Sequence, residues 1–142
     1  MDIVLDASIG VKWFNDKNED YVEKALAIQD KKISGEINII VPDLFFLEVL
    51  NAFITKSQFS SEDISIVNEA LFKMDLEIKY PDNSILSEAS EIALGHNLTL
   101  YDSLYIAVAK SNNTVFYTED KKLLLYREKY PFIADIRDFN II

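Results

Sequence analysis

Four acidic residues lie either just after an expected strand or within an expected helix. Asp6 and Asp120 each follow a short apolar run. Asp102 opens a segment rich in small and apolar residues, and Glu48 lies inside an almost wholly apolar one. Carboxylate oxygens are ligands that Mg²⁺ and Mn²⁺ prefer in proteins. If these side chains converge, they could therefore hold a divalent cation.

Each of these acids also has an ordinary structural explanation. Glu48 could reach solvent at a helix edge or pair with a lysine, because carboxylates are rarely buried without partners. Asp102 could simply be an acid in a first helical turn, where the helix dipole favours its charge. Asp120 could act only as a helix N-cap. The sequence by itself does not prove that the four side chains meet.

The elements that would position these acids follow from the apolar periodicity of the chain. The expected strands cover 3–5, 37–41, 76–80, 114–118 and 133–136. The expected helices cover 19–34, a segment opened by Pro42, 61–74, a segment from Pro81 to Gly95, a segment from Asp102 onward, and a segment after Asp120. This alternation predicts one α/β domain over residues 1–142, with a four- or five-stranded parallel sheet and helices on both faces.

The first strand explains why the acids could meet. Ile3, Val4 and Leu5 lack polar alternation, which is typical of a strand buried on both faces of a parallel sheet. In open α/β sheets, ligands bind in the crevice outside the carboxyl ends of the strands. We therefore expect Asp6 to point into that crevice, with the other acids arranged around it.

The composition narrows the possible functions. The chain has 142 residues, no cysteine and a formal net charge of −10. The lack of cysteine excludes disulfides, thiolate metal sites and cysteine nucleophiles. The negative charge argues against binding nucleic acid by broad neutralisation of phosphates. Any chemistry on nucleic acid must therefore depend on bound metal and a local basic patch.

The sequence also favours a cytoplasmic protein. No apolar run approaches the ~20 residues that a membrane helix needs. The first apolar run is interrupted by Asp2 and Asp6, unlike a signal peptide. His96 is the only histidine, and we expect it in a loop without a metal role.

Four short motifs together resemble those of PIN-domain proteins. They are 5–8 (Leu-Asp-Ala-Ser), the segment from Pro42 through 48–51 (Glu-Val-Leu-Asn), 98–105 (Leu-Thr-Leu-Tyr-Asp-Ser-Leu-Tyr) and 118–120 (Thr-Glu-Asp). In a chain this short, their order is most similar to the VapC-type toxins of toxin–antitoxin pairs. The resemblance implies a three-layer α/β/α fold with strand order 3-2-1-4-5, ribonuclease activity, a homodimer, and an antitoxin protein as partner.

The same resemblance assigns roles to individual residues. Asp6, Glu48, Asp102 and Asp120 would form the acidic quartet that binds Mg²⁺ or Mn²⁺ and carries catalysis. The residues expected to support this quartet are Ser8, Asn51, Thr118 and Glu119. Glu119 is an extra acid that could assist or replace Asp120.

The expected reaction is hydrolysis of an RNA phosphodiester bond by water that a metal ion activates. One metal ion or two is left open, and two would lie ~3.5–4 Å apart. Lys12, Lys121 and Lys122 lie near the acidic motifs and could contact the phosphates of RNA. Alternatively, they are ordinary solvated lysines.

Two other classes of function stay open. One is a catalytically inactive PIN-like module that binds proteins, which the acidic composition favours and the presence of all four acids opposes. The other is a different α/β phosphohydrolase or switch with an acidic pocket. Phosphatases of the haloacid dehalogenase type place a second aspartate two residues after the first, where this chain has Ser8.

Overall fold

The computed structural model describes residues 1–56 and 58–141. Within these ranges, the strands are β1 (Asp2–Leu5), β2 (Asn38–Pro42), β3 (Glu77–Lys79), β4 (Val115–Thr118) and β5 (Ile133–Asp135). They form one five-stranded sheet in the order β3-β2-β1-β4-β5, and every neighbouring pair is parallel. The predicted α/β class and the strand order 3-2-1-4-5 are confirmed.

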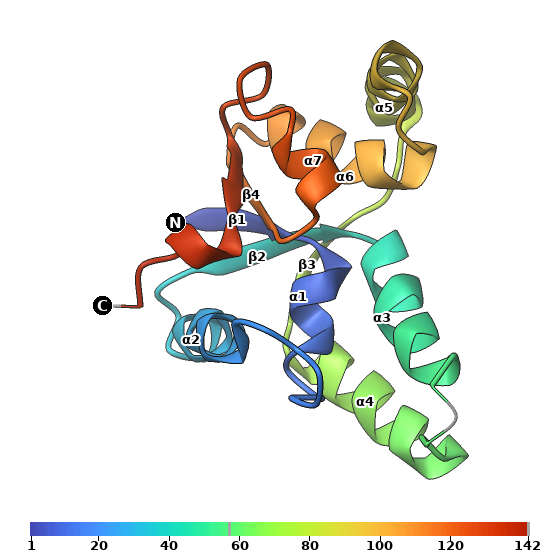
Figure 1. The fold of residues 1–142 in the computed structure, drawn as a ribbon, viewed down its shortest axis with the longest axis vertical. Coiled ribbons are helices and arrows are strands. Elements are labelled where there is room, and N and C mark those ends of the chain that lie inside the picture. Colours follow the sequence, from blue (N-terminus) through green and yellow to red (C-terminus); the bar gives the residue numbers. More distant parts are fainter. Residues whose placement is uncertain (57, 142) are drawn as a thin grey trace.

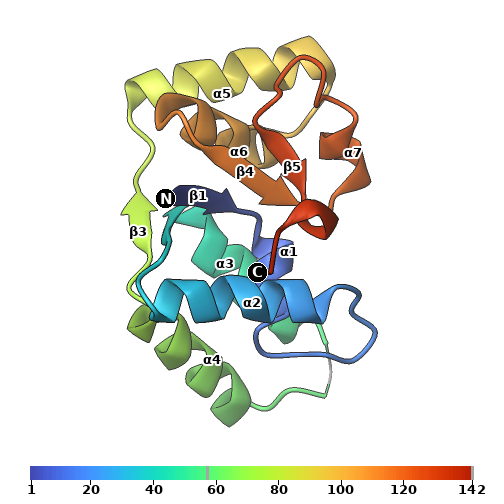
Figure 2. The ribbon, with the colours of Figure 1, turned by 90° about the vertical axis from the view of Figure 1, so that its left-hand side faces the viewer.

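The helices surround this sheet in layers. They are α1 (Ala7–Val11), α2 (Val22–Ile33), α3 (Leu44–Ile54), α4 (Ser61–Lys73), α5 (Asn83–His96), α6 (Leu100–Ser111) and α7 (Lys121–Leu124), with a 3₁₀ turn η1 (Ile136–Asp138). Helix α6 packs on β1, β2 and β4, and α5 packs against α6. Helix α2 lies on the opposite side of the sheet from α6 (Figures 1 and 2).

Strand β1 is the centre of the sheet and of the core. Ile3, Val4 and Leu5 are all 0% exposed, as their uninterrupted apolar pattern predicted. The chain runs from β1 to β2 on one side, whereas β4 pairs with β1 on the other side. The strand order therefore reverses beside β1, which places a crevice at the carboxyl end of this strand.

Side-chain caps fix the start of α4, α5 and α6. Ser60 and Asp63 form a capping box at α4, in which each side chain accepts the backbone N–H of the other residue. Asp82 caps α5, and the Thr99 hydroxyl accepts the backbone N–H of Asp102, 3.0 Å away. The Thr99 cap places Asp102 in the first turn of α6, as predicted.

Three helix boundaries differ from those that the sequence predicted. The helix expected from residue 19 begins at Val22. Pro42 is the last residue of β2 instead of the opening residue of a helix, and α3 begins at Leu44. Helix α5 continues through Gly95 to His96. Asn97 then adopts the left-handed conformation, with φ of 54°, that often ends a helix.

The environments of three side chains also differ from expectation. The almost wholly apolar sequence of α3 would favour burial on all sides, but Leu47 and Ile54 are 66% and 63% exposed. His96 lies in the last turn of α5 and not in a loop; its Nε2 is 3.1 Å from the hydroxyl of Tyr130.

Within the described part of the chain, no helix combines the length and apolar character that crossing a membrane requires.

Helix α1 approaches α3 closely at Gly10. A Cβ at this position would lie 2.6 Å from Cζ of Phe45 and 3.1 Å from Cγ2 of Val49. Phe45 is 0% exposed, so the ring has little room to move. The absence of a side chain at Gly10 therefore sets how closely α1, which follows Asp6 directly, packs on α3, which carries Glu48.

We predict that Gly10→Ala lowers the free energy of unfolding by about 1–3 kcal/mol, because the added methyl group overpacks the contact with Phe45. Urea denaturation measures this change. Gly95→Ala is the matched control: the new Cβ meets no atom within 4 Å, and alanine favours the helix by roughly 0.5–1 kcal/mol. Equal stability of Gly10→Ala and the wild type would show that the contact is not tight.

Candidate active site

The four predicted acids line one pocket at the carboxyl edge of the sheet. The pocket has a volume of about 470 Å³. Its lining consists of Asp6, Ala7, Ser8, Val11, Glu48, Ala52, Asp102, Glu119 and Asp120. Five of these residues are acidic, so the dominant chemical property of the pocket is its negative charge.

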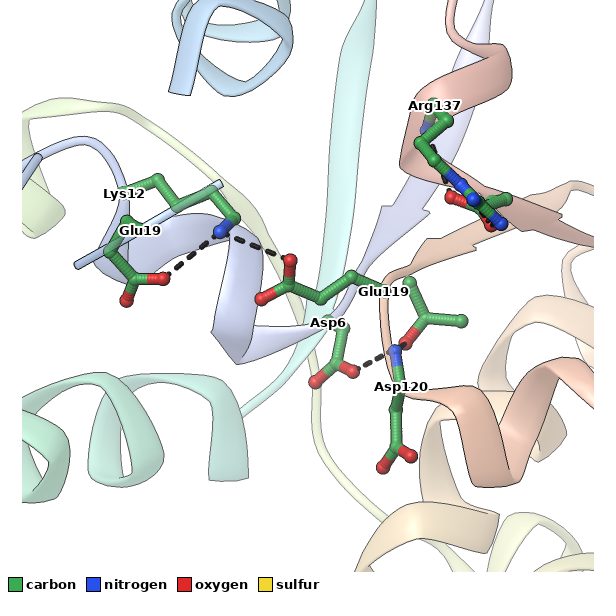
Figure 3. A network of polar contacts seen from close by, with 8 residues as sticks. Asp6, Lys12, Glu19, Glu119, Asp120 and Arg137 are labelled. Carbon is green, nitrogen blue, oxygen red and sulfur yellow. Dashed lines mark hydrogen bonds and ion pairs between the residues drawn. The ribbon is translucent and has the colours of Figure 1, made fainter. Parts of the chain in front are cut away.

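The four acids come from four different parts of the fold. Asp6 follows β1 directly and Asp120 lies just beyond β4, so the parallel pairing of these strands brings the two residues together. Figure 3 shows them beside each other. Glu48 comes from α3 and Asp102 from the first turn of α6. Asp6 and Asp120 are distant in the sequence, yet they share one pocket because each follows one of two neighbouring strands.

A buried threonine ties Asp6 to the turn that carries Asp120. The Thr118 hydroxyl donates to Oδ2 of Asp6 at 2.7 Å and accepts the backbone N–H of Asp120 at 3.0 Å. Thr118 is 0% exposed, so this hydroxyl is held in place. Asp120 also caps α7, its Oδ1 accepting the backbone N–H of Lys122 at 2.9 Å. The supporting position predicted for Thr118 therefore has a specific geometry.

Tyr105 is a site residue to which the sequence analysis gave no role. Its hydroxyl donates to Oε1 of Glu48 at 2.7 Å. The ring is 1% exposed and stacks on Phe116, with the centroids 5.6 Å apart. Tyr105 follows Asp102 by three residues and so lies on the same side of α6, which is the signal that could have revealed it.

The environment of the pocket favours uptake of positive charge. The pKa of Asp6 is raised from 3.8 to about 6, chiefly by burial, although the hydrogen bond from Thr118 opposes this change. The charges of Glu48 and Asp102 contribute to the same rise. Burial also raises the pKa of Glu48, and so does the charge of Asp102. A proton or a cation would therefore stabilise these carboxylates.

The three lysines predicted near the motifs have different environments. Lys121 and Lys122 are exposed, and Nζ of Lys122 lies 3.7 Å from Oδ2 of Asp102. Lys12 differs from the expectation of a lysine that reaches RNA, because its side chain is 0% exposed. Its Nζ lies 3.0 Å from Glu19 and 3.1 Å from Glu119.

Asn51 and Ser8 also have distinct positions. Asn51 is exposed, and the neighbouring Ala52 lines the pocket instead. Ser8 lines the pocket, and its buried hydroxyl has no hydrogen-bond partner among the residues that the structure describes. Such an unpaired polar atom is suited to a ligand that enters the pocket.

The donor groups of the pocket fit a hard divalent cation. Carboxylates and a hydroxyl are the oxygen donors that Mg²⁺ and Mn²⁺ prefer. The described side chains do not form a finished ligand set, since no three acids or histidines among them stand close enough to hold a metal ion. Binding would therefore require the carboxylates of the pocket to move toward the cation.

Comparison with known proteins shows the family of this chain. The family model described as the PIN domain matches residues 3–129. The match extends over most of the chain, from β1 past β4 and α7, and so includes all four pocket acids. The chain belongs to the PIN domain family.

Individual relatives agree with this assignment. Exonuclease VapC9 of Pyrobaculum aerophilum is 28% identical over 95 residues, which are 67% of this chain and 71% of that protein. The solved structure of VapC20 from Mycobacterium tuberculosis, described as a sarcin-ricin loop cleaving toxin, has a TM-score of 0.69 and 12% identity over 87% of this chain and 93% of that one. A toxin–antitoxin complex from Klebsiella pneumoniae has a TM-score of 0.67 and 14% identity, covering 94% of this chain and 97% of that chain. At these identities the two structures establish the shared fold.

The raised pKa of Asp6 predicts a specific dependence of stability on pH without metal. The pKa is about 6 in the folded protein and 3.8 in the reference state, so between these values the folded state holds a proton that the unfolded state has released. The contribution of Asp6 to the free energy of unfolding therefore falls as pH rises from about 4 to 6. Asp6→Asn should remove this decrease with pH. Above pH 6, its free energy of unfolding should exceed that of the wild type by about 1–3 kcal/mol.

Urea denaturation in EDTA between pH 4 and 7 measures this effect. Asp30→Asn changes an exposed aspartate of α2 and is the control, which should keep the wild-type slope. If Asp6→Asn also keeps the wild-type slope, the carboxyl group of Asp6 is not destabilised by its surroundings.

Proposed function

We propose that this protein is a metal-dependent endoribonuclease that hydrolyses RNA phosphodiester bonds. Asp6, Glu48, Asp102 and Asp120 would hold Mg²⁺ or Mn²⁺. The observation that carries the proposal is the convergence of these four carboxylates on one pocket of a PIN domain. The names of the relatives support nuclease activity: VapC9 is named an exonuclease, and VapC20 is described as a toxin that cleaves the sarcin-ricin loop. Cleavage within a loop favours an endonuclease for this fold.

The side chains of the pocket have complementary tasks in this mechanism. When bound, the cation would make a water molecule more acidic and offset negative charge on the phosphate under attack. Thr118 holds the carboxylate of Asp6, and Tyr105 holds that of Glu48. Lys122, which is exposed beside Asp102, would attract an RNA phosphate at the rim of the otherwise acidic pocket, and its exposed neighbour Lys121 would act in the same way.

We further propose that the protein is the toxin of a toxin–antitoxin pair, with an antitoxin protein as partner. The support is the similarity of the fold to a toxin–antitoxin complex from Klebsiella pneumoniae. A cytoplasmic location and a homodimer belong to the same proposal.

The shared cation site is tested by thermal unfolding with and without Mn²⁺. At 100 times the dissociation constant, bound Mn²⁺ should raise the wild-type midpoint by roughly 5–10 °C. Asp102→Asn should lose most of this increase and RNA cleavage with it, because one ligand and its charge are removed. Asp30→Asn removes the same charge from α2 and should behave as the wild type.

Two results would contradict the proposal. If Mn²⁺ leaves the wild-type midpoint unchanged, the acids do not form a working cation site, and the inactive protein-binding module becomes the better explanation. If purified Asp102→Asn cleaves RNA at the wild-type rate, catalysis does not depend on the quartet.

Tyr105→Phe tests the role of the hydroxyl that holds Glu48. Without this donor the carboxylate of Glu48 loses its fixed orientation, so Mn²⁺ affinity should fall about tenfold or more. Calorimetric titration with Mn²⁺ measures the change. Tyr80→Phe removes the hydroxyl of an exposed tyrosine, 68% exposed, and should leave the affinity unchanged. Wild-type affinity in Tyr105→Phe would exclude the positioning role.

A further inference from the structure

Lys12 forms an unusual buried ion-pair cluster beside the pocket. Its side chain is 0% exposed, whereas those of its partners Glu19 and Glu119 are 20% and 28% exposed. A buried cation is costly unless it is paired, and here two carboxylates lie within 3.1 Å of Nζ. The cost of separating Lys12 from these partners holds the three side chains together.

This cluster determines the direction of the Glu119 side chain. Figure 3 shows Glu119 extending toward Lys12, while the carboxylate of the next residue, Asp120, points elsewhere. Asp120 is fixed separately, by the backbone N–H of Lys122 at its Oδ1. Two adjacent acids after β4 thus have different partners and different directions.

We propose that Lys12 is a positioning residue that keeps Glu119 out of the set of cation ligands. The turn after β4 then contributes a single ligand, Asp120. This inference rests on the proposed function, since it assigns a task to a residue around the same cation site. It also gives Lys12, which cannot reach RNA from its buried position, a reason to lie beside an acidic pocket.

The chemistry of Mg²⁺ explains why a fifth ligand would be unfavourable. This ion is usually bound through one or two carboxylates and keeps several water molecules or phosphate oxygens. Five acids line this pocket, so an unrestrained Glu119 would compete with water and substrate for the cation. The ion pair with Lys12 offsets the charge of Glu119 and turns its oxygen away from the other acids.

The ion pair between Lys12 and Glu119 also joins the two segments that carry Asp6 and Asp120. Lys12 follows α1, which begins directly after Asp6, and Glu119 directly precedes Asp120. The Lys12–Glu119 pair therefore links the chain after β1 to the chain after β4. Thr118 makes a second link between the same two segments.

Calorimetric titration with Mn²⁺ separates the two adjacent acids. Glu119→Gln keeps a side chain that can accept from Lys12 and should bind Mn²⁺ within about twofold of the wild type. Asp120→Asn should lose at least about tenfold in affinity. If Glu119→Gln loses as much as Asp120→Asn, Glu119 is a ligand and the inference is overturned. If the wild type itself takes up no Mn²⁺, the proposed function fails first, and this inference fails with it.

A pair of double variants of equal charge tests Lys12 directly. Lys12→Met combined with Glu19→Gln leaves Glu119 free to turn into the pocket, whereas Lys12→Met combined with Glu119→Gln does not. The double variant that keeps Glu119 should bind Mn²⁺ at least about fivefold more tightly than the one that lacks it, because Glu119 adds one more carboxylate to the pocket. Equal affinities would overturn the inference. Should the double variants fail to fold, the single substitutions of Glu119 and Asp120 still decide it.

Discussion

Repulsion among carboxylates in one partly buried pocket is the constraint on which the rest of this site depends. Two carboxylates about 4 Å apart repel by ~4 kcal/mol at an effective dielectric of ~20. At Asp6 this repulsion acts together with burial, which is the larger cause, and the two raise the pKa to about 6. Only a rigid scaffold keeps such groups together, and the fully buried β1 with α6 packed upon it supplies that scaffold.

Each acid of the quartet has a polar partner. Thr118 restrains Asp6, Tyr105 restrains Glu48, the backbone N–H of Lys122 restrains Asp120, and the side chain of Lys122 approaches Asp102. These partners orient the acids without neutralising the pocket, apart from the exposed lysine. The remaining negative charge is what a divalent cation would offset. A pocket of this kind gains stability from the same cation that would perform its chemistry.

The sequence predicted the sheet and the positions of Asp6 and Asp120 because both depend on local signals, whereas the roles of Glu48 and Asp102 came from the resemblance to PIN domains. An uninterrupted apolar run marked β1, and acids directly after apolar runs marked the carboxyl edge of the sheet. The burial of Lys12 was not predictable, since it depends on Glu119 far away in the chain. The spacing of Tyr105 from Asp102 indicates the side of α6 on which Tyr105 lies, but not its hydrogen bond to the distant Glu48. Pro42 was misassigned because proline suits both a strand end and a first helical turn.

The central claim is that Asp6, Glu48, Asp102 and Asp120 share one cation, and crystals grown with Mn²⁺ test it most directly. Anomalous scattering locates Mn²⁺ independently of any assumption about the ligands. The account predicts an anomalous peak inside the pocket. Carboxylate oxygens of this quartet should lie ~2.0–2.2 Å from that peak, which is the coordination distance of such an ion. A peak elsewhere on the molecule, or none at saturating Mn²⁺, would contradict the account.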